Sequence, residues 1–282
     1  MRFLENPKSK KYCLQFSALL ALVVWLIGLH GCVTQRIPTP LPQSPWGEIY
    51  AFSYHLPPDA VIASPGSVPV TVAVVNPSYK EEESALGTTL FSKVGKGFST
   101  SMGTDLDKIL IAKGVTTTGP FPSLSEITYS EKKDAALTLA PKVFVTTEVR
   151  KLGAPHQVYG AHPPRSEQDF EMSITGWVAF IMQEPLSGEK MWIKKLELEP
   201  VKTLGIVANE SIPQYSSDGC GGTMVNGYTM GNVVYDGRVD AMASALKEMY
   251  PVIMAQFQKY LDTNEMVQLK DKGKEIRALK VY

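Results

Sequence analysis

The alternation of apolar and polar side chains predicts a sheet of five to seven mostly antiparallel strands. A two-residue period places every second side chain against a core. This period occurs in residues 48–55, 137–149, 170–182 and 191–199, and shorter runs rich in β-branched residues fill 68–75 and 115–121. The phase changes near Lys194-Lys195, where we expect a β-bulge. Residues 152–169, rich in Pro, His and Gly, predict a loop between two strands.

A period of three to four residues predicts a long helix in the first half of the chain. We expect it to be capped by Ser78 and to end at Gly114. Glycines within it, including Gly97 and Gly103, are costly in a helix. They indicate either close packing against the sheet or a break near residues 99–103.

A second amphipathic helix is expected from about Gly237, with a kink predicted by Pro251. A polar helix on the surface follows Asp262. These elements predict an α+β fold, in which the long helix and the C-terminal helix pack on one face of a mostly antiparallel sheet.

Residues 204–236 fit neither period well. They are rich in glycine, and the segment is too long for an idle connection in a compact domain. It contains Cys220 within a Gly-rich run, either as an exposed reactive thiol or as a packed loop residue. We expect this segment to have a role beyond linking two elements.

The N-terminus has the pattern of a bacterial lipoprotein signal peptide. A basic segment precedes an apolar run from Phe16 to Leu29, longer than roughly 7 residues but shorter than the ~20 that span a bilayer. Leu29 and Gly31 then precede Cys32 in the spacing recognised by lipoprotein export. We expect residues 1–31 to be removed as the signal peptide and Cys32 to be acylated and held by membrane lipid. The alternatives are cleavage at another site and an uncleaved membrane anchor.

The sequence after the cysteine predicts which membrane holds the protein and how the domain is connected to it. Val33 is not the aspartate that retains lipoproteins at the inner membrane, so we expect the outer membrane, with the face of the membrane left open. Residues 32–47 contain four prolines and predict an extended tether. Residues 48–282 then form a single domain with a polar helical tail at its C-terminal end.

Charge and cysteine content exclude several classes of protein. Residues 1–31 hold four of the 28 basic and one of the 28 acidic side chains, so the mature chain has 24 basic and 27 acidic residues. This balance argues against nucleic-acid binding, which requires a basic surface. Cys13 leaves with the signal and Cys32 carries lipid, so Cys220 has no intramolecular disulfide partner.

Candidate catalytic and metal-binding residues are sparse. Ser130 and Lys133 have the Ser-x-x-Lys spacing of penicillin-binding enzymes, but the partner motifs are missing and a turn is the better interpretation. His156 and His162 share a loop with acidic residues, and without a rigid element beneath them we interpret them as solvated. We therefore expect no enzyme, no metal and no cofactor.

Several short segments carry a family resemblance. The main one is Gln183 to Glu189 with the alternating strand after it, and further matches follow at Tyr54-His55, Asn76-Pro77, Tyr129 to Asp134 and Ser217 to Val225. Together they resemble the neuraminyllactose-binding haemagglutinin (HpaA-type) family of outer-membrane lipoproteins. The resemblance covers about residues 48–275 and implies the same α+β domain.

The resemblance also implies a ligand. Members of that family are surface or flagellar-sheath lipoproteins described as adhesins for sialylated glycans. Where the family has a basic tract after the third strand, this chain has only Arg150 and Lys151. Since a sialic-acid carboxylate is best held by arginine with hydrogen-bonding neighbours and an aromatic platform, the candidate glycan-binding residues are Arg150, Lys151, Tyr159 and Arg165.

Two functions follow as expectations. The first is a surface adhesin, a haemagglutinin that binds sialylated glycans at the cell surface. The alternative is a structural or assembly lipoprotein of the outer membrane or flagellar sheath. It would bind an envelope protein through residues 204–236 or through the edges of the sheet.

Overall fold

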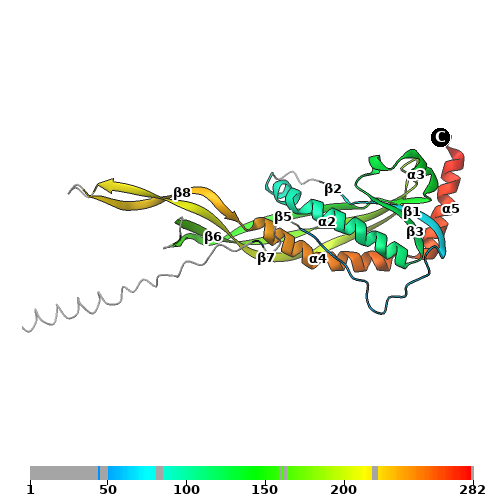
Figure 1. Cartoon of the computed structure of the whole chain (residues 1–282), viewed down its shortest axis with the longest axis horizontal. Coiled ribbons are helices and arrows are strands. Elements are labelled where there is room, and N and C mark those ends of the chain that lie inside the picture. The colour runs from blue at the N-terminus through cyan, green and yellow to red at the C-terminus, as the bar shows by residue number, and fades with distance from the viewer. Residues whose placement is uncertain are drawn as a thin grey trace, which may run out of the picture.

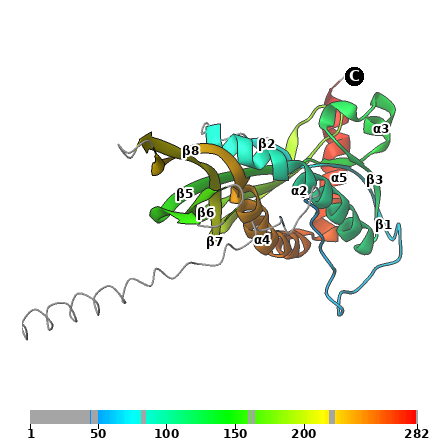
Figure 2. The same ribbon diagram turned by 60° about the vertical axis from the view of Figure 1, so that its left-hand side comes forward.

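A mixed eight-stranded sheet runs along the molecule and carries its helices mainly on one face (Figure 1). The computed structural model describes residues 44, 50–80, 85–158, 161, 164–217 and 222–280. Helices α2 (Ala85–Ala112) and α4 (Arg238–Tyr260) lie along one face, and α5 (Thr263–Leu279) crosses the end of the sheet (Figure 2). The predicted α+β class is confirmed.

Strand β6 (Arg165–Gln183) is the centre of the sheet. One of its edges pairs with β5 (Lys142–Val158) and then with β4 (Leu137–Leu139), and the other edge pairs with β7 (Lys190–Ser217). All three pairings are antiparallel, as is that of β7 with β8 (Thr223–Asp236). The parallel pairs are β1 (Val68–Val75) with β3 (Val115–Phe121), β1 with β4, and β2 (Ser78–Lys80) with β5.

Strands β1 and β3 coincide with the predicted runs, whereas the predicted loop at 152–169 is wrong. Strands β5 and β6 continue into it as a long hairpin, in which Leu152 pairs with Asp169 and pairing resumes at His156 with Glu167. The register shift between these pairs accommodates Gly153, whose φ of +68° suits glycine. The bulge interrupts the two-residue period, which is why the sequence pattern predicted a loop.

The predicted strand at 48–55 is also wrong over the residues that are described. Residues 50–56 form no ladder but run along α2. The Phe52 amide donates to Ser101 Oγ (3.0 Å) and the Tyr54 amide donates to Asp105 Oδ2 (2.8 Å). Side chains of a helix therefore satisfy the backbone groups that a neighbouring strand would satisfy.

Helix α2 begins later than predicted. Ser78 does not cap it, because Ser78–Lys80 is the short strand β2 and the helix starts at Ala85. The helix continues without a break through residues 99–103. Its glycines allow close approach instead: a Cβ on Gly97 would lie 1.6 Å from the Tyr50 carbonyl oxygen, and one on Gly103 would lie 1.9 Å from Asn76 Oδ1.

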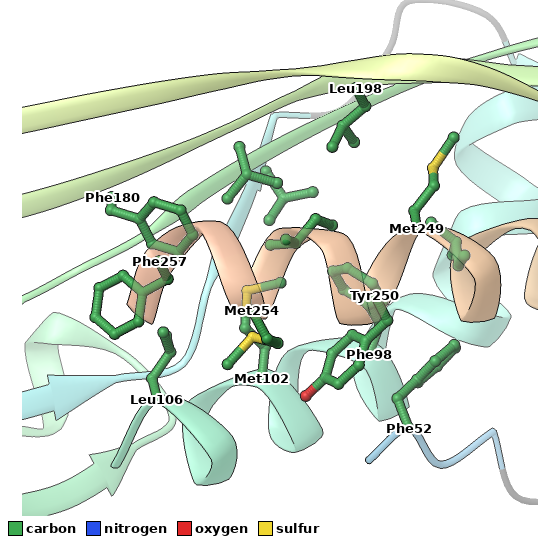
Figure 3. Close-up of a cluster of buried hydrophobic side chains, with 14 of the residues drawn as sticks. Phe52, Phe98, Met102, Leu106, Phe180, Leu198, Met249, Tyr250, Met254 and Phe257 are labelled. Atoms are coloured by element: carbon green, nitrogen blue, oxygen red, sulfur yellow. The ribbon is translucent and has the colours of Figure 1, made fainter. Parts of the chain in front are cut away.

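The core fills the space between α2, α4 and the sheet (Figure 3). Its side chains come from α2, from α4 and from the sheet, among them Phe98, Met102, Leu106, Phe180, Leu198, Tyr250, Met254 and Phe257. The buried Tyr250 hydroxyl donates to Asp105 Oδ2 (2.8 Å), and burial, followed by this hydrogen bond, raises the pKa of Tyr250. Asp105 of α2 is only 2% exposed, and its carboxylate thus links this helix to α4 and to the backbone of Tyr54.

The polar helix after Asp262 begins as predicted, with the Asp262 side chain accepting from the Asn264 amide (2.9 Å). It is more than a surface element, because one side of it buries Met266, Leu269 and Ile276. In the described parts of the chain, no helix is long and apolar enough to cross a membrane.

Candidate interaction surface on the β-arm

Residues 204–236 form a projecting β-arm. Strand β7 pairs with β6 as far as Glu210, opposite Arg165, and beyond this point it pairs only with β8. Residues 211–217 and 223–230 therefore form a two-stranded ribbon past the end of β6, about 23 Å long from the rise per strand residue, and residues 231–233 of β8, next to Asn209, form its base. We call it the distal ribbon; it projects at the end of the molecule opposite α5 (Figure 1). Three register shifts between β7 and β8 explain why the sequence period was weak.

One face of the distal ribbon is apolar. Residues directly opposite each other in an antiparallel pair share a face, and Pro213 faces Tyr228 while Tyr215 faces Val225. Continuing the alternation defines the apolar stripe: Pro213, Tyr215, Val225, Tyr228, Met230 and Val233. The stripe lies on the side of β7 that faces the helices. Thr203 is an even number of residues from Pro213 and Tyr215, so it lies on the same face, and its hydroxyl donates to the Ala241 carbonyl of α4 (3.1 Å).

The stripe is exposed. Tyr215 is 65% and Met230 63% exposed, and the other large members lie between 41% and 52%. The area is on the order of 600 Å², the upper end of the ~300–600 Å² that the largest apolar patch on a typical monomer exposes, and such patches are often functional. Asp218 is the only charged residue between 211 and 235 in the sequence. Tyrosine and methionine without charge are typical of the centre of a protein interface.

The outer edge of β8 is unprotected. In the described part of the chain β8 pairs only with β7, so its other edge presents free backbone donors and acceptors. Proteins usually shield such an edge with lysine, proline or a covering element, yet residues 223–236 contain neither lysine nor proline. The ribbon thus offers both an apolar face and an open edge.

The base of the arm is fixed to α4 and to the N-terminal segment through Asp240. This carboxylate accepts from the Ser44 hydroxyl (2.6 Å), the Tyr235 hydroxyl (3.2 Å) and the Tyr50 hydroxyl (3.5 Å). Burial, followed by the charge of Asp240, raises the pKa of both Tyr50 and Tyr235. The chain that leads to the predicted lipid anchor therefore meets the domain at the root of the arm.

The predicted glycan-binding residues do not form one cluster. Arg150 pairs with Glu171 and Lys151 with Phe170, so these neighbours project from opposite faces of the sheet. Arg165 lies six residues from Glu171 along β6, about 20 Å away. It is 8% exposed, and its Nε donates to Glu167 Oε1 (2.7 Å). Tyr159 lies outside the described residues.

An aromatic pair that the sequence reasoning missed lies on the sheet face opposite α2 and α4. The rings of Phe144 and Trp177 stack with centroids 5.7 Å apart, and Lys195 Nζ lies 5.0 Å from the centre of the Trp177 ring. Both aromatic side chains are half-buried. The available signal was that each stands at a position of its strand where the alternation predicts a polar residue.

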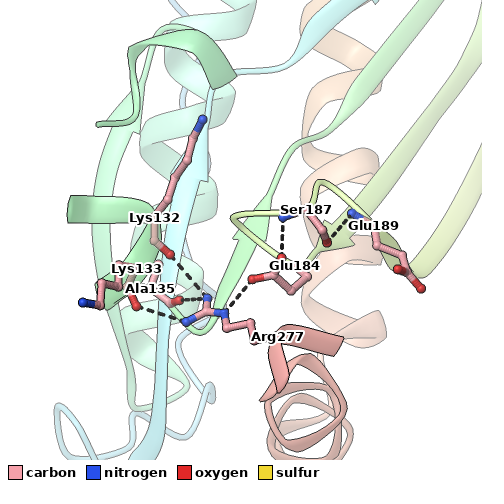
Figure 4. A network of polar contacts seen from close by, with 7 residues as sticks. All are labelled: Lys132, Lys133, Ala135, Glu184, Ser187, Glu189 and Arg277. Carbon is pink, nitrogen blue, oxygen red and sulfur yellow. Dashed lines mark hydrogen bonds and ion pairs between the residues drawn. The ribbon is translucent and has the colours of Figure 1, made fainter. Parts of the chain in front are cut away.

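The motif that carries the family resemblance is a structural turn. Glu184, fully buried, accepts from the Ser187 amide and from Arg277 Nε (2.6 Å) (Figure 4). Arg277 of α5 also donates to the carbonyls of Lys133 and Ala135, at 3.0 and 2.6 Å. The turn, α3 (Tyr129–Asp134) and α5 are thereby held together.

The described residues that the sequence singled out for catalysis or metal binding lie in separate elements, β5 and α3. Among them no three His, Cys, Asp or Glu side chains are grouped to hold a metal ion. His156 Nε2 lies 3.7 Å from Glu167 Oε2, and His162 lies outside the described residues. Ser130 and Lys133 lie in α3, whose start is capped by Thr128. Cys32 and Cys220 also lie outside the described residues, so their predicted roles stay predictions.

Known proteins resemble this chain in structure rather than in sequence. No protein-family model matches it, and no curated protein matches it in sequence. A proposed neuraminyllactose-binding hemagglutinin homolog from Helicobacter pylori is similar over 77% of this chain and 97% of its own, with 16% identity and a TM-score of 0.49. A Xanthomonas campestris protein covers 79% and 98%, with 11% identity and a TM-score of 0.29.

A minor lipoprotein from Acinetobacter baumannii is similar over 69% of this chain and 92% of its own, with 11% identity and a TM-score of 0.20. At these identities the relationships concern the fold alone.

Proposed function

We propose that this chain is a non-catalytic envelope lipoprotein, anchored through Cys32, whose β-arm binds a protein partner. The observation that carries the proposal is the apolar stripe of the distal ribbon, where Tyr215 and Met230 are each more than 60% exposed. Exposed apolar surface of this extent is unfavourable in water unless a partner covers it.

The position of the arm supports a role in assembly. The ribbon stands past the end of β6 and past both long helices, so a partner can reach its two faces and its open edge. Its root also joins Ser44, which brings the chain toward the membrane anchor. A lipoprotein built in this way holds a rigid body near the membrane and presents the ribbon to a neighbour.

Photo-crosslinking in cell envelopes tests this function. A benzophenone amino acid in place of Tyr215 is expected to yield one adduct of defined mass that contains an envelope protein. The matched control is Tyr129 on α3, which is 62% exposed against 65% for Tyr215. The same adducts from both positions, or none from Tyr215, would contradict the proposal.

Glycan binding is the second candidate, and the Phe144–Trp177 pair is the observation that favours it. A half-buried aromatic pair on the sheet face opposite α2 and α4 offers a flat surface on which a sugar ring can stack, and Lys195 lies beside it. This platform is about 20 Å along β5 from Arg150, one of the residues that the sequence indicated.

The glycan proposal is tested with sialyllactose. If the platform binds it, Trp177→Ala weakens binding by about fivefold or more, because one stacked aromatic contributes about 1 kcal/mol or more. Arg150→Ala leaves binding nearly unchanged. Titration of the full-length chain measures both. If binding depended on Arg150 and not on Trp177, the glycan site would lie at the residues that the sequence indicated and not at the Phe144–Trp177 pair. Absence of any binding removes this candidate.

A further inference from the structure

We propose that the apolar stripe of the distal ribbon packs face to face against the same stripe of a second copy of this chain. The inference rests on the proposed function, because it names the partner of the same ribbon. It assigns a symmetric contact, in which each ribbon supplies the same side chains to the other.

Charge favours a second copy as the occupant. In a two-fold symmetric contact, a surface meets itself, so a charged group near the axis faces its own copy. The described residues of the distal ribbon carry no charge at all, and Glu210 and Asp236 lie beyond its base. A stripe of Tyr, Val, Met and Pro side chains is complementary to itself.

The area also matches what a dimer requires. The stripe exposes on the order of 600 Å², so two stripes packed face to face bury up to about 1,200 Å² in total, the lower end of the range for specific interfaces. Two strand faces packed in this way lie about 10 Å apart with interdigitating side chains, as in a β-sandwich.

The architecture allows two ribbons to meet. The stripe continues the side of β7 that α4 covers nearer the body, but α4 begins only at Arg238 and leaves the ribbon bare. The side of the ribbon that carries Ile212 and Thr229 includes the polar Gln214 and Ser216 beside the exposed Met224. The stripe side also carries Ser217 and Thr223 near its far end. Both faces of the ribbon are exposed, and the stripe carries more of the large apolar side chains than the opposite face does.

Disulfide scanning of the full-length chain in cell envelopes tests the contact. A Cys220→Ser background removes the other free thiol. Single cysteines then replace stripe residues Val225, Tyr228, Met230 and Val233, and opposite-face residues Ile212, Met224 and Thr229 serve as matched controls. We expect mild oxidation to give a disulfide-linked homodimer from at least one stripe position, about tenfold above every opposite-face position.

A charge variant gives an independent readout. Tyr228→Lys places two like charges in the contact, and burying them is costly. We expect it to reduce the dimer formed through the Met230→Cys thiol by about tenfold or more, whereas Tyr129→Lys, on the body, leaves the dimer unchanged. Circular dichroism of each variant verifies that the domain is folded.

Other outcomes overturn the inference. Equal crosslinking from both faces means that the ribbons meet along their edges instead. Heterologous adducts without homodimer assign the stripe to another protein, which rejects the second copy but leaves the proposed function intact. Absence of any adduct from the ribbon rejects both.

Discussion

Two glycines in helices have opposite surroundings, and they give a prediction at the scale of single residues. A Cβ on Gly97 of α2 would lie 1.6 Å from the Tyr50 carbonyl oxygen, whereas one on Gly273 of α5 would meet its nearest neighbours at 3.6 Å. Alanine favours a helix over glycine by up to ~1 kcal/mol. We expect Gly273→Ala to raise the free energy of unfolding by about 0.5 kcal/mol and Gly97→Ala to lower it by about 2 kcal/mol.

Urea denaturation of the two variants measures the difference. The same substitution in both helices controls for the intrinsic preference of alanine. If Gly97→Ala were as stable as the parent, the close approach of residue 50 to α2 would not contribute to the fold.

The buried Glu184–Arg277 pair predicts acid sensitivity. Burial alone would raise the pKa of the Glu184 carboxyl, but hydrogen bonds from Ser187 and Arg277 outweigh it and lower the pKa. The ionised group therefore adds stability above its unfolded pKa of ~4.3. That stability is lost as the pH falls through the lowered folded pKa.

We expect Arg277→Ala to cost about 3 kcal/mol near neutral pH, because it leaves a buried carboxylate without its cation. Glu184→Gln is expected to flatten the fall in the free energy of unfolding below about pH 5. Denaturation as a function of pH measures both effects. If the free energy of unfolding of Glu184→Gln fell below pH 5 as steeply as that of the parent, other carboxylates would be responsible for the acid sensitivity.

At the scale of elements, the distal ribbon should be separable from the body. Between Ser211 and Met230 the two strands pair only with each other. Replacing residues 212–229 by Asn-Gly, a favoured two-residue hairpin turn, should leave the melting temperature of the body within about 4 °C of the parent, since about 1 kcal/mol shifts a domain of this size by that much. A collapse of the melting transition would show instead that the ribbon is part of the core.

The sequence predicted an element well where the local residue types decide the structure, and poorly where a contact with a distant segment decides it. The runs at 68–75 and 115–121 became β1 and β3 at the predicted bounds, since their β-branched residues favour a strand both inside the sheet, as in β1, and at its edge, as in β3. The alternation at 50–54 gave the correct buried residue, Phe52, but the wrong element. Its partner is α2, and a contact between segments some 50 residues apart leaves no local signal.

The sequence singled out the segment of the proposed interaction surface but not the form of that segment. The segment 204–236 was recognised as too long for a connector, but its register shifts concealed the two strands. The stripe could be recognised only once Tyr215 was known to lie opposite Val225, because face is a property of the pairing and not of either strand alone. Likewise, Phe144 and Trp177 become a platform only across two strands.

At the scale of the whole molecule, the two ends have different roles. The end with α5 is closed by the Arg277 contacts with Glu184 and the carbonyls of Lys133 and Ala135. The opposite end carries the ribbon, whose strands have an open edge and an uncovered face. The chain thus joins a body closed by side-chain contacts at one end to a ribbon that few residues of the body touch.

The attachment of residues 50–56 to α2 has a mechanical consequence. These residues have no ladder, and separate bonds from the Phe52 and Tyr54 amides to Ser101 and Asp105 hold them to the helix. Tension on the proposed lipid anchor would first load the bond between Ser44 and Asp240 of α4 and then residues 50–56 on α2, so the helices would carry it. Such bonds break one after another rather than together, so a pull peels the segment away from α2 before any strand of the sheet is loaded.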